Sequence, residues 1–429
     1  MSSGDNDTAA PAAGKVKLGI DFRALWASST AAALGMGMTG VVVPLLAIEV
    51  FDADPFAVSV LIAAENMPWL VLGLVAGVWV DRWPKRRVLV VASLVRFGAL
   101  LALPVLWLAG ALNFWNTLFV IAITGMTSIF TTVASVSFLP TLVTGPQLVA
   151  ANSRLAAGQS GGGLLGEASA GFLYQAIGGP LVLLVEAATS AFSALAISRT
   201  RPDVVGPEGS ATPRTRFRKE LLAGLRITLA DRVFRPITIS ATLTNMAEAA
   251  RYAVLPSFLV THLAAPVATV GLVIAAIGVG GLFGSLACER LSKRHGSARV
   301  WRAALFMTAV SALLVSFAQP GLGLVVAGVG SFLTGFFGAI SNVVSSSARQ
   351  AICPPHLLGR LAATSRTITW GAIPLGALAG GAIATLIGTQ PAFILLVLPI
   401  LAALAVIWMS PLGRVRAIET LEPMTTGDE

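Results

Sequence analysis

The stretch Gly73–Arg87 reads GLVAGVWVDRWPKRR and separates an apolar segment from a cluster of cations. Its first eight residues are apolar or glycine, Asp81 and Arg82 follow, and three more cations end the stretch. Lys and Arg gather on the cytoplasmic side of a membrane-spanning segment. The stretch therefore indicates the inner end of a span.

The composition of the whole chain agrees with a membrane protein. It is 55% hydrophobic and 11% charged, with a mean hydropathy of +0.82, whereas a soluble domain has about 25% charged residues. Its 429 residues can supply roughly twelve spans of about 20 apolar residues. We predict an all-α integral membrane protein with twelve transmembrane helices at 22–50, 55–80, 88–110, 114–141, 152–177, 180–198, 236–262, 266–290, 298–318, 321–349, 360–388 and 390–411.

The net charge of +9 comes from cations confined to alternate connections. This positive-inside pattern predicts that both termini are cytosolic, and it replaces a nucleic-acid partner as the explanation of the charge. Cys288 and Cys353 both lie near connections assigned to the cytosol, where disulfides are rare. We therefore expect no disulfide.

One long polar connection, 199–235, divides the predicted spans six and six. Its part Phe217–Leu229 has one apolar and one basic stripe, which favours a helix lying along the inner membrane surface; the alternative is a solvated connector. The predicted domains are a cytosolic tail at 1–21, a bundle at 22–198, this linker, a second bundle at 236–411 and a cytosolic tail at 412–429.

The two predicted bundles have related sequences. DRWPKR from Asp81 aligns with ERLSKR from Glu289, and PQLV from Pro146 aligns with PHLL from Pro355 at nearly the same offset. Two parallel repeats with a substrate path between them are an arrangement found in secondary transporters. We predict two pseudo-symmetric six-helix bundles.

These residues resemble the major facilitator superfamily over nearly the whole chain. Gly77-x-x-x-Asp81-Arg82-x-x-Lys85-Arg86 is similar to the superfamily's signature between its second and third spans. The text from Phe138 (FLPTLVTGPQLVAANSRLAAGQSGGGLLG) and from Gln350 (QAICPPHLLGRLAATSRTI) is similar to a bacterial drug/proton antiporter branch that includes macrolide-efflux proteins and the enterobactin exporter. The chain departs from the pattern at Pro84, Ser93 and Glu167, the last replacing the proline of the exporter signature.

The resemblance implies the major facilitator fold, with a cytosolic gate at the duplicated motif. A carboxylate at a helix C-terminus faces the negative end of the helix dipole and needs a positive partner. We expect Asp81 to contact the start of the eleventh span and Glu289 to face Asn152–Arg154; a plain charge cluster that only sets topology is the alternative. The gate residues are predicted to be Gly77, Asp81, Arg82, Glu289, Arg290 and Arg360.

Four carboxylates fall inside predicted spans, away from the span ends: Glu65, Glu167, Glu186 and Glu248. Intramembrane carboxylates are costly against lipid and mark proton or substrate paths. We predict proton coupling by Glu248, Glu167 and Glu65, with Arg251 adjusting Glu248 from one turn away; the alternative for Glu248 and Arg251 is a permanent structural pair. Glu186 is expected to anchor its helix, with proton coupling as the alternative. Arg96 lies inside the third span and must find a structural partner or extend its charged end to the cytosolic face; contact with the substrate is the alternative.

Polar and aromatic side chains are predicted to line a substrate cavity, namely Asn66, Trp69, Phe130, Asn245, Tyr252, Phe336, Phe337 and Trp370. For each aromatic residue, a position facing lipid or inside the core is the alternative. The chain has no phosphate-binding G-x-x-x-x-G-K-[S/T] motif, no metal-ligand spacing and no catalytic triad. We therefore expect no enzyme activity, no cofactor and no metal, with the proton gradient as the driving force.

Taken with the resemblance, these features predict a proton-coupled exporter of amphipathic or hydrophobic small molecules, such as a drug, an antibiotic or a siderophore-like compound. It would work by alternating access, as a monomer in the bacterial cytoplasmic membrane, with the bilayer, protons and substrate as its partners. A uniporter or importer of a metabolite and a transport-inactive membrane receptor are the alternatives.

Overall fold

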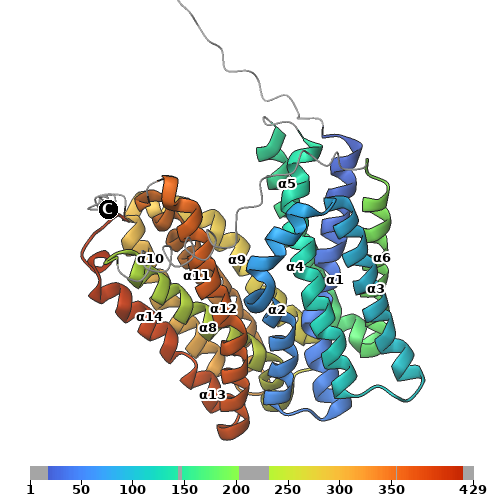
Figure 1. Cartoon of the computed structure of the whole chain (residues 1–429). Helices are drawn as coiled ribbons and strands as arrows, with labels where there is room; N and C mark the ends of the chain where they lie inside the picture. Colours follow the sequence, from blue (N-terminus) through green and yellow to red (C-terminus); the bar gives the residue numbers. More distant parts are fainter. Residues whose placement is uncertain (1–17, 144–146, 202–230, 354, 419–429) are drawn as a thin grey trace, which may run out of the picture.

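The computed structural model describes residues 18–143, 147–201, 231–353 and 355–418, without the side chains of 73–75, 77–78, 81 and 355–363. The described chain is helical, in two bundles that stand side by side (Figure 1). We call the end that holds Leu18 and Ile418 the tail end, and the opposite end, where Phe51 turns into Pro55, the far end.

The first bundle consists of six helices: α1 (Ile20–Phe51), α2 (Pro55–Arg82), α3 (Lys85–Leu108), α4 (Phe114–Leu142), α5 (Leu148–Ile177) and α6 (Gly179–Ser198). Side-chain caps mark where two of these helices begin. The Asp54 side chain caps α2 just before Pro55, a proline position that suits a first turn. Asn113 and Asn116 form a reciprocal capping box at the start of α4.

The second bundle begins with α8 (Phe234–Ser257), which η2 (Phe258–His262) extends by a π-helical turn. It continues with α9 (Val267–His295), α10 (Ser297–Ser316), α11 (Gly323–Ile352) and α12 (Pro355–Ile387). The last span is divided into α13 (Thr389–Leu395) and α14 (Leu398–Met409), and η3 (Pro411–Gly413) follows it. The all-helical, two-bundle fold predicted from the sequence is confirmed.

The sequence predicted one continuous helix for the twelfth span, and the structure breaks it after Leu395. Pro399 has no backbone N–H, so the bond that a continuous helix would make from residue 399 to the Leu395 carbonyl is absent. Val397 donates to the Ile394 carbonyl, as in a tightened last turn. The break leaves the Phe393 carbonyl without its helical donor.

Ten described segments are long and apolar enough to cross a membrane, and α5 and α8 are not among them. Helix α8 is largely buried and packs against α12 and α14, whereas α5 packs one face against α1 and α9 and leaves Leu165 and Phe172 exposed on the other. Helix faces shielded from lipid can carry polar and small residues that a lipid-facing surface could not. Most of the predicted linker, and with it Phe217–Leu229, lies outside the described residues.

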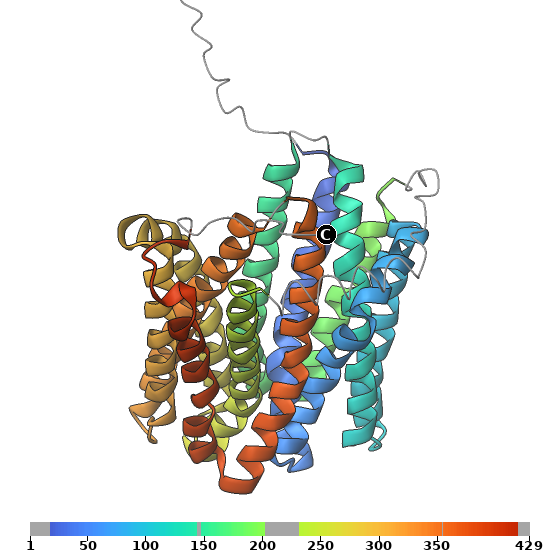
Figure 2. The same cartoon turned by 60° about the vertical axis from the view of Figure 1, so that its left-hand side comes forward.

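The bundles are joined through α2 with α12 and α5 with α9; Figure 2 shows α12 beside α2. At the far end, one apolar cluster contains residues of both bundles, among them Leu46, Leu183, Val254 and Phe393. Near the tail end each bundle has its own cluster, one around Phe138 and Leu89 and the other around Trp301 and Phe234. The bundles are therefore closed together at the far end and diverge toward the tail end (Figure 1).

Candidate functional site

A cavity of about 630 Å³ lies between the bundles. Helices α1, α2 and α4 line it on one side, and α8, α9 and α11 line most of the other. Seven residues predicted for proton coupling or for the cavity line it: Glu65, Asn66, Trp69, Asn245, Glu248, Arg251 and Tyr252. Most of its remaining wall is made of apolar, glycine, serine and threonine residues. Such a surface suits an amphipathic ligand oriented by a few polar groups.

Arg251 is held by backbone carbonyls of its own bundle. It donates to the Phe393 carbonyl and to the Ala312 carbonyl, both at 3.0 Å, and its guanidinium lies 4.6 Å from the centre of the Phe393 ring. Its donation to Phe393 replaces the helical bond lost where the twelfth span breaks. Arg251 therefore connects α8 to α10 and α13.

Glu248 lies on the cavity wall one turn before Arg251. The described residues give its carboxylate no hydrogen bond and no salt bridge, although Arg251 lies within electrostatic range. Gly338 of α11 faces it so closely that a Cβ atom there would stand 2.9 Å from Glu248 Oε1. Arg251 thus acts on Glu248 through space while its donors bind elsewhere.

Two other predicted cavity residues, Asn245 and Tyr252, contact a neighbouring helix. Asn245 donates to the Thr369 carbonyl of α12 at 3.1 Å, which fixes its amide at the cavity wall. The Tyr252 hydroxyl belongs to the second bundle but faces Gly40 of α1, where a Cβ atom would be 3.1 Å away. Tyr252 therefore lies at the interface between the two bundles.

Glu167 is not among the residues that line the cavity, and it lies where α5 packs against α9. A Cβ atom at Gly278 would come within 3.7 Å of Glu167 Oε2, and Gly271 packs against the Glu167 backbone. These glycines of α9 let the two helices approach closely. The structure thus places Glu167 at the interface between the bundles.

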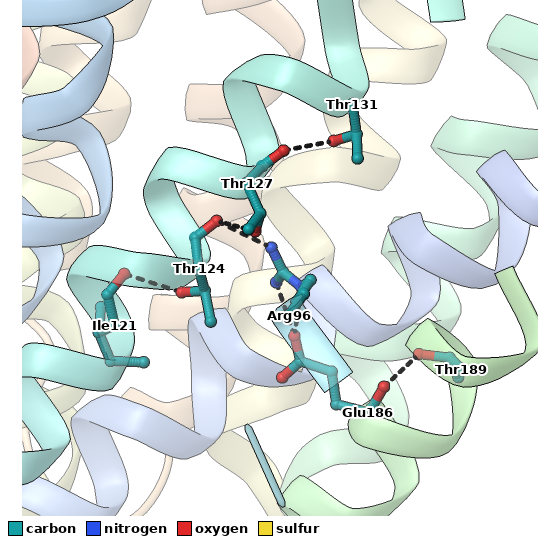
Figure 3. Close-up of polar contacts among 7 residues, drawn as sticks. All are labelled: Arg96, Ile121, Thr124, Thr127, Thr131, Glu186 and Thr189. Carbon is teal, nitrogen blue, oxygen red and sulfur yellow. Dashed lines mark hydrogen bonds and ion pairs between the residues drawn. The ribbon is translucent and has the colours of Figure 1, made fainter. Parts of the chain in front are cut away.

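Arg96 and Glu186 form a buried ion pair between α3 and α6 (Figure 3). Arg96 Nη2 and Nε donate to Glu186 Oε1 at 2.6 and 3.2 Å, and Nη1 donates to the Thr124 carbonyl of α4 at 3.3 Å. Thr189 donates to the Glu186 backbone carbonyl. The pair supplies the partner that the sequence required for Arg96, and it gives Glu186 the anchoring position expected for it.

The predicted gate is only partly described, because the side chains of Gly77, Asp81 and Arg360 lie outside the described set. Arg82, Glu289 and Arg290 are exposed at the tail end. Glu289 was expected to face Asn152–Arg154, but it pairs with Lys293 of its own helix at 2.6 Å. That pairing fits bundles that diverge at the tail end.

Four predicted cavity aromatics pack elsewhere. Phe130 stacks on Trp79 at 6.3 Å, and Phe336 and Phe337 pack against the tail-end cluster of the second bundle. Trp370 makes an edge contact with Trp69 at 5.3 Å, with the Arg366 guanidinium 4.9 Å from its ring. Only Trp69 of that pair lines the cavity.

Sequence reasoning missed a hydroxyl-rich wall on α11. Ser331, Thr334, Ser341 and Ser345 line the cavity, and Trp301 Nε1 donates to Ser341 Oγ at 2.9 Å. Ser341 and Ser345 are four residues apart and so share one helix face. That spacing of hydroxyl residues within an otherwise apolar helix is the sequence signal from which this wall could have been predicted. No group of His, Cys, Asp and Glu suited to a metal ion occurs within the described chain.

Comparisons with known proteins agree with this geometry. The model of a family described as transmembrane secretion effector matches residues 10–426. The multidrug efflux pump Tap of Mycolicibacterium fortuitum is 28% identical over 388 residues, covering 88% of this chain and 92% of that protein. The enterobactin exporter EntS of Shigella dysenteriae serotype 1 is 26% identical over 399 residues, covering 90% and 92%.

Among solved structures, a bacterial homologue of the iron transporter ferroportin, in an inward-facing state, superposes with a TM-score of 0.72. That match has 17% identity and covers 90% of this chain and 97% of that one. At this identity the likeness shows the fold alone.

Proposed function

The chain belongs to the transmembrane secretion effector family of the major facilitator superfamily, and we propose that it exports an amphipathic or hydrophobic small molecule in exchange for protons. It is a multi-pass membrane transporter and not an enzyme. One observation carries the proposal: a cavity of about 630 Å³ between the bundles has carboxylates on both walls, Glu65 and Glu248.

The cavity chemistry supports this choice of substrate. Trp69, Tyr252 and the aliphatic wall provide apolar contact area, and the α11 hydroxyls and Asn245 provide a few hydrogen bonds. Neither cavity carboxylate has a hydrogen-bond partner among the described residues, so each is available to a proton or to the substrate. The relatives named as a multidrug efflux pump and an enterobactin exporter favour export over import.

The alternating-access cycle starts from the conformation described here. The positive-inside pattern assigns the tail end to the cytosol of a bacterial inner membrane, so the cavity opens inward and the far-end cluster closes the outside. Substrate enters from the cytosol, the tail end closes, and the far-end cluster separates. A proton taken up on a cavity carboxylate removes a charge that holds the substrate, and this favours release and return. The transporter works as a monomer.

Transport into proteoliposomes tests the proposal, with ethidium as the probe. In vesicles whose exposed face is the tail end, an acidic lumen drives ethidium inward, and a proton ionophore abolishes the accumulation. Glu248→Gln lowers the initial rate roughly tenfold, whereas Glu49→Gln, which removes an exposed carboxylate, leaves it unchanged. Ethidium uptake that does not respond to the pH gradient would refute proton coupling, and uptake only with an alkaline lumen would indicate an importer.

A further inference from the structure

Three charged side chains lie within electrostatic range of one another inside the first bundle, each from a different helix: Glu65 of α2, Arg96 of α3 and Glu186 of α6. We call them the triad. Only Glu65 lines the cavity. The Arg96 and Glu186 side chains are 8% and 0% exposed, so they lie behind the wall to which Glu65 belongs.

The contact between Arg96 and Glu186 is one-sided. Both guanidinium donors that reach the carboxylate bind the same oxygen, Oε1, as Figure 3 shows. Glu186 Oε2 is buried and has no hydrogen-bond partner among the residues that the structure describes. A buried carboxylate oxygen without a donor costs less free energy when its group is neutral than when it is charged. The ion pair alone therefore does not satisfy Glu186.

Helix α4 contacts both Arg96 and Glu65 through consecutive residues. The Thr124 carbonyl accepts a hydrogen bond from Arg96, and the next residue, Gly125, packs on the Glu65 backbone, where a Cβ atom would come within 3.0 Å of the Glu65 Cα atom. Arg96 and Glu65 lie within electrostatic range of each other, and so do Glu65 and Glu186. Among the described residues, the Glu65 carboxylate has no hydrogen bond and no salt bridge.

The charges of the triad do not cancel. Two carboxylates and one guanidinium leave one negative charge. Of the neighbouring helices, α4 has no charged residue and the charged residues of α1 lie near its two ends. The arginines of α12 and α8 that lie nearest bind elsewhere, because Arg366 lies over the Trp370 ring and Arg251 donates to carbonyls of its own bundle. One bound proton makes the sum zero. In the second bundle, Glu248 and Arg251 already balance without a proton.

We propose that the triad is a proton-binding unit that holds one proton, shared between Glu65 and Glu186, with Arg96 positioning the Glu186 carboxylate and acting on Glu65 through space. Two interacting acids titrate as one unit, so the proton belongs to the pair. Glu65 exchanges this proton with cavity water, since Glu186 has no solvent contact. This inference rests on the proposed proton coupling and assigns it to the first bundle.

The charge count gives a defined expected result for each variant. The measurement is the infrared C=O stretch of protonated carboxyl groups in the purified full-length protein near neutral pH, taken as the change from wild type. Glu65→Gln and Glu186→Gln each lose one carboxylic acid, because the remaining carboxylate pairs with Arg96. Arg96→Gln gains one, because both carboxylates then need a proton. Glu49→Gln, the matched surface control, changes nothing.

An unchanged carboxylic acid signal in Glu65→Gln or in Arg96→Gln overturns the triad. If Arg96→Gln does not fold, the double variant Arg96→Gln/Glu186→Gln removes both members of the ion pair and leaves Glu65 alone with its proton. Its signal then equals that of wild type, and a lower signal overturns the proposal. Ethidium transport is measured separately. Proton-driven transport with a failed charge count refutes the triad alone, and the reverse result refutes the coupling alone.

Discussion

Replacing Arg251 by leucine should destabilise the second bundle more than any change to an exposed arginine. The side chain is 6% exposed and donates two hydrogen bonds to backbone carbonyls, of Phe393 and Ala312. Ser316 also donates to the Ala312 carbonyl, but the Phe393 carbonyl lost its helical donor at the break in the twelfth span. Phe393 is 1% exposed, so removing Arg251 leaves its buried carbonyl without a donor.

The magnitude follows from the contacts. A hydrogen bond from a charged group contributes about 1.5–3 kcal/mol, and a desolvated cation–π contact such as that with Phe393 contributes about 2 kcal/mol. Allowing for incomplete additivity, Arg251→Leu should lower the free energy of unfolding by about 4 kcal/mol. For a bundle of this size that corresponds to roughly 8 °C or more in melting temperature.

Thermal unfolding of the purified protein in detergent measures this effect. Arg251→Lys keeps the charge but cannot form the planar fork, so we expect about half the loss of Arg251→Leu. Arg235→Lys and Arg235→Leu, at an exposed position near the start of α8, serve as matched controls. If Arg251→Leu melts at the wild-type temperature, Arg251 is free for substrate and the bracing role is wrong. A transport defect in a variant of unchanged stability would lead to the same conclusion.

Three further predictions follow from single contacts. Gly338→Val puts atoms where the Glu248 carboxylate lies and should slow ethidium transport roughly tenfold, about 1.4 kcal/mol, while Gly338→Ala slows it less; equal rates in both would contradict this. Burial raises the pKa of the Cys353 thiol, and because the thiolate is the reactive form, maleimide labelling of Cys353 in a Cys288→Ser background should lag behind a small free thiol until the pH is well above neutral. The exposed pair of Glu289 and Lys293 should leave the melting temperature unchanged when Glu289→Gln breaks it, because solvent screens such pairs, and a clear drop would show a buried partner.

The number and order of the spans could be predicted from the sequence, because hydropathy and charge are properties of consecutive residues. The cation clusters at Arg82 and Arg290 lie at or near the ends of α2 and α9, as predicted, and the predicted apolar segments form helices in the structure. The break within the twelfth span was missed, although Pro399 is visible in the sequence. A proline near mid-span either kinks or divides a helix, and local sequence does not distinguish these outcomes.

Site residues were harder to predict. Helical periodicity placed Glu248, Arg251 and Tyr252 on one helix face, and all three line the cavity. Phe130 and Phe337 have the same local character as Trp69, yet they pack into the bundles. An aromatic side chain suits a cavity wall and a core equally well, so composition does not separate them.

The sequence by itself determined that the chain crosses a membrane repeatedly, in two related halves, with its cations on one side. Each of these follows from free energies of transfer that depend on residue type and neighbours along the chain. Only the tertiary structure decided that Arg96 pairs with Glu186 beside Glu65, that Arg251 braces α13, and that the far end is the closed one. Those facts depend on which helices meet and at what depth, and that is fixed by close packing between residues far apart in the chain.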